Sequence, residues 1–184
     1  MQRANREAAI AAFETFGITG RNHALAAYWL SLWRGERMPM RADFNPARVG
    51  ALLPGIGLFS VKPGAHSVCR LAGTAIAQAT GHELTGLDWR RYTPKAECKV
   101  RLERNSAVAC GQVAIGMRSR ERPDGQTEHT TELQLPFADE AEDGTRQILF
   151  HLDWRASGHA STARANLEPP ALRIADAFHA ISLL

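Results

Sequence analysis

The histidines are the side chains of this chain best suited to bind a metal ion or a haem iron. Seven of them are scattered over the 184 residues. His129 and His151 fall on consecutive predicted strands, where they could lie across from one another, and His82 precedes a long predicted helix. The sequence shows no further ligands at the spacing that metal sites use. We therefore expect these histidines to be sheet and surface residues, and we expect no metal site.

Catalytic motifs are incomplete wherever the sequence hints at one. His82-Glu83 is similar to the start of a zinc-protease helix, but Gly86 stands where that motif requires a second histidine. Gly55-Ile56-Gly57 lacks the third glycine of a dinucleotide-binding loop and precedes a predicted strand, so it indicates a turn. The sequence contains no P-loop and no nucleophile elbow. We expect no catalytic residues and no enzymatic activity.

Arginines within predicted strands are candidates for ligand binding. If Arg70 and Arg118 face a cavity, each would hold an anionic ligand through a forked, charge-assisted hydrogen bond; otherwise they face solvent or an acidic partner. Trp89 follows a loop, where it could either plug the core or form one wall of a pocket. The candidate ligand-binding set combines these side chains with apolar neighbours: Arg70, Ile76, His82, Leu84, Trp89, Leu102, Ile115, Arg118 and Leu133.

The chain as a whole is mildly basic. Its 22 Lys and Arg against 19 Asp and Glu give a net charge of +3, with a pI near 9.0. This is well below the positive charge density of a dedicated nucleic-acid binder. Basic residues do cluster at Arg90-Arg91 and from Lys95 to Arg104, which we interpret as a solvated helix face or else as a weak anion or nucleic-acid patch. We expect no nucleic-acid partner.

The cysteines and the apolar runs indicate the compartment. The three cysteines lie far apart and form no metal-binding or redox pair, which is typical of a reducing compartment. The first residues contain no apolar stretch of signal-peptide length, and no run of about 18 apolar residues occurs. We expect a cytoplasmic protein with no membrane partner.

Five segments alternate apolar and polar residues as strands do. They lie at 56–61, 67–72, 113–120, 127–136 and 146–152. In 127–136 the residues Thr131, Leu133 and Leu135 share one face, while Glu128, Thr130, Glu132 and Gln134 share the other. The last three strands follow one another through short turns, which predicts an antiparallel meander with one face exposed to water.

Helical spacing of apolar residues predicts the remaining elements. We expect helices near 4–16, 22–34, 43–54, 74–80 and 94–110. Trp29 and Trp33 share one helix face, which either covers an open face of the sheet or forms an aromatic ligand box. Residues 155–168 indicate a linker before an amphipathic tail helix that carries Leu172, Ala175, Phe178 and Ile181. The fold class is α+β, with an N-terminal helical extension at 1–21, a domain at 22–153, and the linker and C-terminal helix at 154–184.

The order of these elements and several short motifs resemble the PAS domain, and in particular a bacterial family of small stand-alone PAS proteins of unassigned function. The motifs run roughly over residues 24–152: Tyr28-Trp29, Arg41-Ala42-Asp43, Leu52-Leu53-Pro54, Cys69 to Thr74, Gly81 to Gly86 and Glu132 to Pro136. The resemblance implies a five-stranded antiparallel sheet with helices on one face. It also implies a sensory and interaction module that holds a small ligand, a haem or a flavin between the sheet and the middle helices, or holds nothing.

The resemblance leaves the chemistry open. His82 lies where some haem-binding PAS domains place a histidine, yet no cysteine here has the context of the flavin-binding type, so the cofactor is unknown. We expect a cytoplasmic regulatory module that binds a small ligand, a protein signalling partner, or both, and that forms a homodimer through its terminal helices. The alternatives are a ligand-free interaction adaptor and an enzyme on a similar sheet. The adaptor would have a solid core of Leu71, Ile76, Leu84, Leu102, Ile115 and Leu133.

Overall fold

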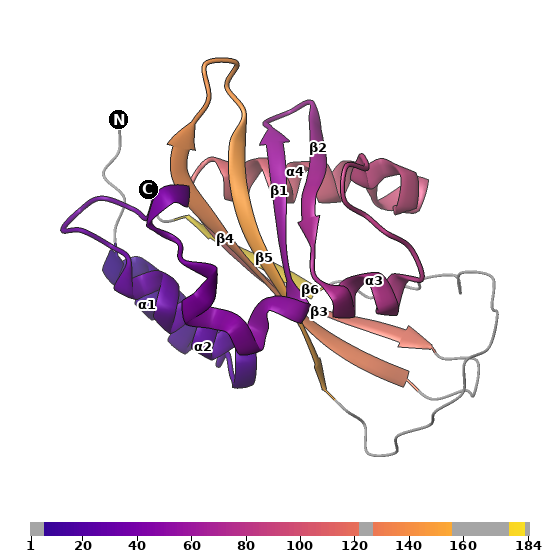
Figure 1. The fold of residues 1–184 in the computed structure, drawn as a ribbon, viewed down its shortest axis with the longest axis horizontal. Helices are drawn as coiled ribbons and strands as arrows, with labels where there is room; N and C mark the ends of the chain where they lie inside the picture. Colours follow the sequence, from indigo (N-terminus) through magenta and orange to yellow (C-terminus); the bar gives the residue numbers. More distant parts are fainter. Residues whose placement is uncertain (1–5, 122–126, 156–176, 183–184) are drawn as a thin grey trace.

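The strands of the protein pair side by side in one antiparallel sheet (Figure 1). The computed structural model describes residues 6–121, 127–155 and 177–182. Within these residues the sheet has six strands in the order β2-β1-β5-β4-β3-β6. The strands are β1 (Ile56–Lys62), β2 (His66–Ala72), β3 (Gln112–Glu121), β4 (Thr127–Glu140), β5 (Arg146–Arg155) and β6 (Ala177–Ser182). The five predicted strands and the α+β class are confirmed.

Helices cover both faces of this sheet (Figure 1). One face carries α1 (Arg6–Thr15), α2 (Gly20–Ser31) and the 3₁₀ segments η1 (Arg41–Asp43) and η2 (Pro46–Gly55). The other carries α3 (Thr74–Thr80), the 3₁₀ segments η3 (Trp89–Tyr92) and η4 (Lys95–Glu97), and α4 (Cys98–Ala109). The expectation of helices on a single face therefore needs correction. No described helix combines the length and the apolar character needed to cross a lipid bilayer.

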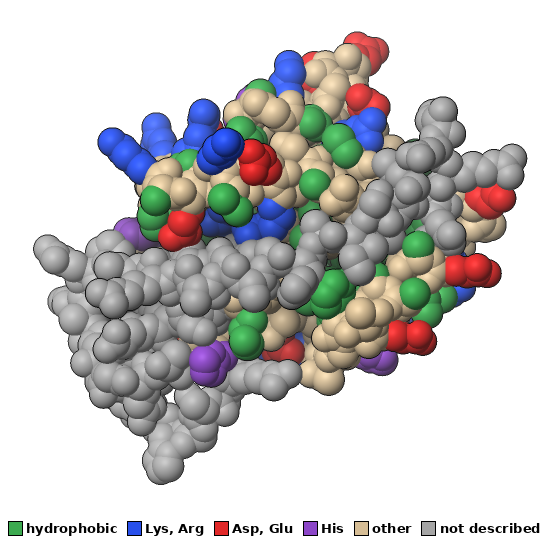
Figure 2. All heavy atoms as spheres, turned by 180° about the vertical axis from the view of Figure 1, so that it is seen from behind, with side chains coloured by type: hydrophobic (Ala, Val, Ile, Leu, Met, Phe, Trp, Pro, Cys, Tyr) green, Lys and Arg blue, Asp and Glu red, His purple; other side chains and the backbone are tan. Residues whose placement is uncertain are grey.

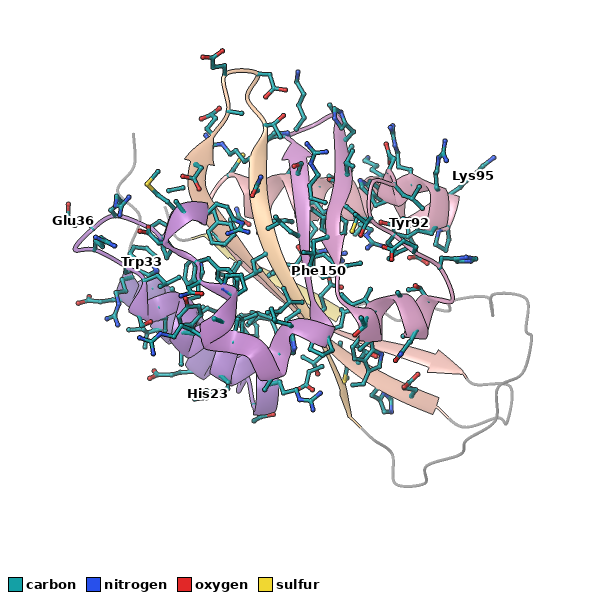
Figure 3. The ribbon with its side chains drawn as sticks, viewed as in Figure 1. His23, Trp33, Glu36, Tyr92, Lys95 and Phe150 are labelled. Carbon is teal, nitrogen blue, oxygen red and sulfur yellow. The ribbon has the colours of Figure 1, made fainter. Side chains whose placement is uncertain are left out.

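The layer of α1 and α2 is organised around two tryptophans. Trp29 is fully buried, and its Nε1–H donates to the carbonyl of Pro136 in β4 at 3.0 Å. Phe13 and Trp33 both meet the Trp29 ring edge to face, with centroids 6.4 and 5.6 Å away. Figure 3 labels Trp33 within this helical layer. The aromatic face of the predicted helix thus covers one face of the sheet, as one of the two sequence interpretations stated.

The layer of α3 and α4 has a second apolar core. Phe59 of β1 and Phe150 of β5 stack at 4.5 Å between ring centroids, and Figure 3 shows Phe150 among the central strands. Gly57 lies in β1, within the strand predicted at 56–61, and not in the turn that the Gly55-Ile56-Gly57 motif indicated. A Cβ at this position would lie 2.0 Å from Cζ of Phe150. Only glycine leaves room for the Phe150 ring at this point of the sheet.

The C-terminal segment differs from the prediction. Residues 177–182 form β6 rather than an amphipathic helix and pair antiparallel with β3, with Val113 opposite Ile181. An unpaired β3 would be an open sheet edge with unsatisfied backbone groups, and β6 satisfies them along that edge. Strand β5 also continues to Arg155, past the predicted domain boundary. The positions Leu172 and Ala175 of the predicted helix lie outside the described residues.

Candidate functional site

A group of polar side chains is buried between α4 and the sheet. Ser67 of β2, Asn105 of α4 and Gln134 of β4 are fully buried, and Glu132 of β4 is 1% exposed. We call these four residues the polar cluster. Polar side chains are rarely buried unless they bond to one another or to a ligand, so the cluster is the most unusual feature of this core.

Hydrogen bonds connect the members of the polar cluster. Gln134 Nε2 donates to Glu132 Oε1 at 2.6 Å and lies 3.4 Å from Asn105 Oδ1. Asn105 Nδ2 in turn donates to Ser67 Oγ at 3.3 Å. The network therefore links β4 to β2 through α4, and it fixes the position of the helix over the sheet.

Strand register explains why these residues come together. Glu132 and Gln134 are two apart in β4, so both point to the same face of the sheet. They stand opposite Leu152 and Phe150 of β5, which belong to the apolar core below α4. Asn105 is buried on the same helix as Val108 and Ala109, so one face of α4 brings its amide to the sheet.

Two fully buried residues on this side of the sheet each hold a polar atom with no hydrogen-bond partner among the described residues: Oε1 of Gln134, an acceptor, and Nε1 of Trp89, a donor. Leaving such an atom unpaired costs roughly 1–3 kcal/mol. A ligand that presents both a donor and an acceptor would satisfy what the protein leaves unmet.

Arg101 lies at the start of α4, against the aromatic residues of η3. Its guanidinium lies over the rings of Trp89 and Tyr92, 5.6 and 5.9 Å from their centroids, and Nη1 donates to Thr93 Oγ1 at 3.0 Å. Cation–π contact and the hydrogen bond together hold this half-buried arginine in place. It carries positive charge close to Trp89, whose Nε1 has no hydrogen-bond partner among the described residues.

Basic side chains gather outside this corner, at the end of the molecule where Figure 2 shows several blue side chains together. Arg91, Lys95 and Lys99 are exposed, which agrees with a solvated helix face. Arg90 is exposed as well, but its Nε lies 2.9 and 3.0 Å from the two carboxylate oxygens of Asp88. That hydrogen-bonded guanidinium, together with the backbone N–H of Arg90, lowers the pKa of Asp88 below its ordinary value.

The structure separates the predicted binding residues into groups. Ile76, Leu84 and Trp89 are buried together beside α4, and Leu102 packs against them. Ile115 and Leu133 lie on the opposite face of the sheet, in the core below α1 and α2.

The polar members of the predicted set are not assembled with this core. Arg70 is exposed, and its Nε donates to Ser60 Oγ at 3.1 Å, so it faces away from the polar cluster. His82 is exposed on the loop after α3. The side chain of Arg118 lies outside the described residues. Neither Arg70 nor His82 therefore belongs to the site that the geometry indicates.

The polar cluster was missed because Glu132 and Gln134 were assigned to a face exposed to water. A signal against that assignment was present in β5. Its two faces carry Leu149 on one side and Ile148 and Phe150 on the other, so both faces of the sheet have apolar surface to cover. The polar face of β4 must then be covered too, since it lies beside Phe150.

The two strand histidines do not meet. His151 stands opposite Leu133, whereas His129 stands opposite Arg155, at the far end of the same strand pair. His151 is buried on the α2 side, and burial lowers its pKa to about 4. Over the described residues, no group of three or more His, Cys, Asp and Glu is placed to hold a metal ion.

Comparison with known proteins gives matches among solved structures and none among curated protein sequences. The Rhodobacter sphaeroides LOV protein is 16% identical over 59% of this chain and 65% of its own, with a TM-score of 0.40. VqmA of Vibrio cholerae is 15% identical over 62% of this chain and 54% of its own, also with a TM-score of 0.40. The PAS domain of an HTR-like protein from Haloarcula marismortui is 14% identical over 59% of this chain and 90% of its own, with a TM-score of 0.36.

This chain spans between about half and two thirds of the length of the LOV and VqmA structures that it matches. The sequence profile of the PAS domain matches residues 19–152, which run from the start of α2 to near the end of β5. That stretch contains the polar cluster, most of the core on each face and every strand except β6 and the last residues of β5. The chain therefore belongs to the PAS domain family.

Proposed function

We propose that this protein is a sensory or regulatory module that binds a small polar ligand between α4 and the sheet. The observation that carries the proposal is the polar cluster, with the unmet acceptor of Gln134 and the unmet donor of Trp89 on the same side of the sheet. Small-molecule sites are mostly apolar, with a few placed polar groups that give orientation and specificity. The mixture of Ile76, Leu84 and Phe150 with the polar cluster has this character.

A ligand at this place would act on the position of α4. Asn105 connects the helix to Ser67 and Gln134, so a ligand that bonds to Gln134 competes with or extends that network. A conformation of α4 that binds the ligand better gains population when the ligand is present. A protein signalling partner that contacts α4 or its basic end would detect this shift.

The test begins with the protein as purified. Native mass spectrometry and an absorption spectrum reveal a retained small molecule, a haem or a flavin. The variant Gln134→Leu removes the unmet acceptor while nearly preserving side-chain volume, and we expect it to lose the bound molecule. Gln147→Leu is the matched control, because Gln147 pairs with Ser60 in β1 and lies on the other face of the sheet.

The adaptor alternative predicts the opposite outcome. It requires a solid core that binds nothing, and then Gln134→Leu changes no ligand-binding property and affects only the stability that the hydrogen bond to Glu132 provides. The six residues expected to fill that core do not form one: Leu71 is 47% exposed, and Ile115 and Leu133 lie on the other face. A purified protein free of small molecules, together with a ligand screen without hits, would favour the adaptor over the sensor.

The proposal includes a cytoplasmic location and no catalysis. The three cysteines are free, which suits a reducing compartment. Cys69 is buried, and burial raises the pKa of its thiol to about 11, so it is a structural residue rather than a nucleophile.

We also propose that the protein forms a homodimer, but not through the terminal helices that the sequence suggested. Two terminal helices were expected to mediate it. The first, α1, buries Ala9, Ala12 and Phe13 in the core between the α1–α2 layer and the sheet, and residues 177–182 form a strand instead of a helix. A dimer would then form through other surfaces. Sedimentation over a dilution series tests it, and a monomer at micromolar concentration would remove it.

A further inference from the structure

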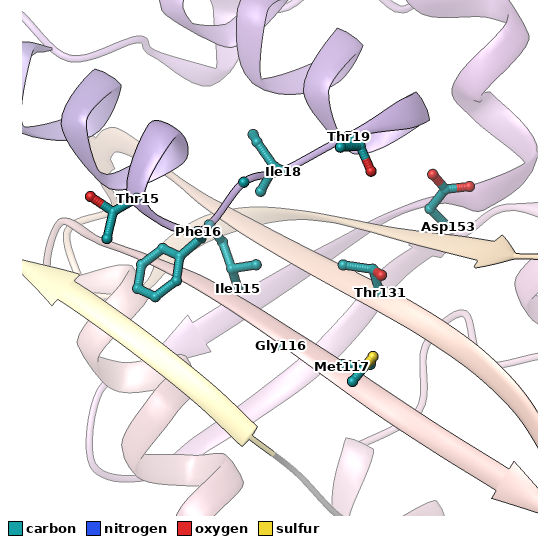
Figure 4. Close-up of a pocket in the computed structure, with 10 residues that line it drawn as sticks. Thr15, Phe16, Ile18, Thr19, Ile115, Gly116, Met117, Thr131 and Asp153 are labelled. Atoms are coloured by element: carbon teal, nitrogen blue, oxygen red, sulfur yellow. The ribbon is translucent and has the colours of Figure 1, made fainter.

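A pocket lies on the opposite face of the sheet from the polar cluster (Figure 4). Its walls are the turn between α1 and α2 on one side and strands β3, β4 and β5 on the other. It encloses ≈ 370 Å³, a volume within the range of small-molecule sites. The pocket shares no lining residue with the polar cluster, so it does not depend on the function proposed above.

One end of the pocket is apolar. Phe16 and Ile18 come from the turn, and Ile115 and Met117 come from β3. Met117 is 51% exposed, although the residue two positions earlier in the same strand is almost completely buried. An apolar side chain of this size, left open at the mouth of a pocket, gains free energy when a ligand covers it.

The other end carries a carboxylate. Asp153 is the one charged side chain among the described residues that line the pocket. Thr131 stands directly opposite Asp153 across the β4–β5 pair, so the two side chains share a face, and Figure 4 shows them close together. A carboxylate and a neighbouring hydroxyl both accept hydrogen bonds, which suits a donor group on a ligand.

One of the two oxygens of this carboxylate already accepts a hydrogen bond from the protein. Oδ2 of Asp153 accepts the backbone N–H of Arg21 at 3.1 Å, and Thr19 makes no capping bond with its side chain, so Asp153 caps the start of α2. Gly20 permits this approach, because a Cβ there would lie 2.9 Å from Oδ2. No hydrogen bond from a described residue reaches Oδ1 of the same carboxylate, which leaves it available to a ligand.

We propose that this pocket binds a small organic cation, with its ammonium group on Asp153 and a compact apolar body against Met117 and Ile115. An ammonium bonded to a carboxylate makes a charge-assisted hydrogen bond, whereas a neutral hydroxyl in its place makes an ordinary one. An anionic ligand would meet the negative charge of Asp153. The bound cation would bridge the start of α2 to the sheet.

Benzylammonium and benzyl alcohol are suitable probes, because they have similar shapes and differ in the charge of one group. NMR titration of the full chain would follow the backbone amides of Gly17 and Gly116, which belong to the pocket, and of Gly81 and Gly86, which do not. We expect saturable shifts at Gly17 and Gly116 only, with benzylammonium binding about tenfold more tightly than benzyl alcohol.

The variant Asp153→Asn removes the charge but keeps an oxygen that accepts from Arg21, so α2 retains its cap. We expect it to abolish the preference for benzylammonium and to leave the weak binding of benzyl alcohol unchanged. Glu142→Gln is the matched control, because it removes an equal charge from an exposed turn. The proposal is overturned if Gly17 and Gly116 show no saturable shifts, if both probes bind equally, or if Asp153→Asn retains the preference.

Discussion

At the scale of single residues, His151 joins α2 to the sheet. It is 1% exposed, and its Nδ1 lies 2.7 Å from Oδ1 of Asn22 in α2. Since an amide oxygen only accepts hydrogen bonds, Nδ1 carries the proton and donates it. Asn22 Nδ2 also donates to the carbonyl of Thr131 at 3.1 Å. This pair of side chains therefore depends on a neutral imidazole that is shielded from water.

We predict that the protein becomes less stable as the pH is lowered, because of His151. Burial is the largest cause that lowers its pKa, from 6.5 to about 4, so between these values the unfolded chain binds the proton and the folded chain does not. The contribution is complete above pH 6.5 and is lost as the pH falls toward 4, with a total of ~3 kcal/mol. Urea unfolding at a series of pH values measures it.

His151→Gln should flatten this part of the pH profile, because glutamine donates a hydrogen bond without titrating. His129→Gln is the control, since His129 is exposed. A profile between pH 4 and 6.5 that is equally steep in all three proteins would contradict the assignment to His151.

Gly57 gives a second prediction at this scale. Gly57→Ala would place a methyl group 2.0 Å from Cζ of Phe150, whose ring already stacks on Phe59. Forcing the ring to move costs roughly 1–3 kcal/mol of unfolding free energy. Gly50→Ala is the control, because a Cβ there meets nothing within 4 Å, and its effect should stay within about 0.5 kcal/mol. Equal stability of the two variants would show that the Phe150 ring yields without strain.

At the scale of elements, α2 is held to the sheet by Trp29. Trp29→Phe removes the donor to the carbonyl of Pro136 and leaves that buried acceptor unpaired, which we expect to cost ~2 kcal/mol of unfolding free energy. Trp33→Phe removes a similar ring, but Trp33 Nε1 has no hydrogen-bond partner among the described residues. Chemical denaturation should therefore show a larger loss for Trp29→Phe. A larger loss for Trp33→Phe would mean that ring area, rather than the hydrogen bond, attaches α2.

At the scale of the whole molecule, the three cysteine thiols differ in how far they are buried. Cys110 is exposed, Cys98 is half-buried and Cys69 is buried in the core below α4. With a pKa of about 11, the Cys69 thiol is ionised in roughly one molecule in a thousand at pH 8, and the thiolate is the reactive form. We predict that iodoacetamide labels Cys110 first and Cys69 only when the protein unfolds globally, as peptide mass spectrometry would show.

Urea supplies the control for this labelling order. In denaturant, all three thiols should react at similar rates, because burial no longer separates them. Labelling of native Cys69 as fast as that of Cys110 would mean that the α4 layer opens without global unfolding.

Alternation of residue types predicted the strands well. The pattern of β4 and β5 correctly placed Leu133 on the same face as Leu135, and it set Leu149 and His151 apart from Ile148 and Phe150. Residues with period two share a face in any sheet, so this information is local. The burial of Trp29 and Trp33 was equally predictable. Two tryptophans four residues apart lie on one face of a helix, and so large an apolar face must be covered.

The candidate site was not predictable in the same way. Glu132 and Gln134 look like exposed residues until α4 is placed over them, and Arg70 looks like a pocket residue until its side chain is seen on Ser60. The tail at 177–182 has apolar residues compatible with a helix, and only the open edge of β3 decides that it pairs as a strand.

Apart from the tail at 177–182, the amino-acid sequence by itself determined which of the described residues form the strands and the main helices, which of them share a face, and that the chain resembles a PAS domain. The tertiary structure decided which faces are covered and by what: α4 over the polar face of β4, α2 over the other face, and Asp153 at the start of α2. The reason is physical. Side-chain periodicity is a property of neighbouring residues, whereas burial depends on contacts between segments far apart in the chain.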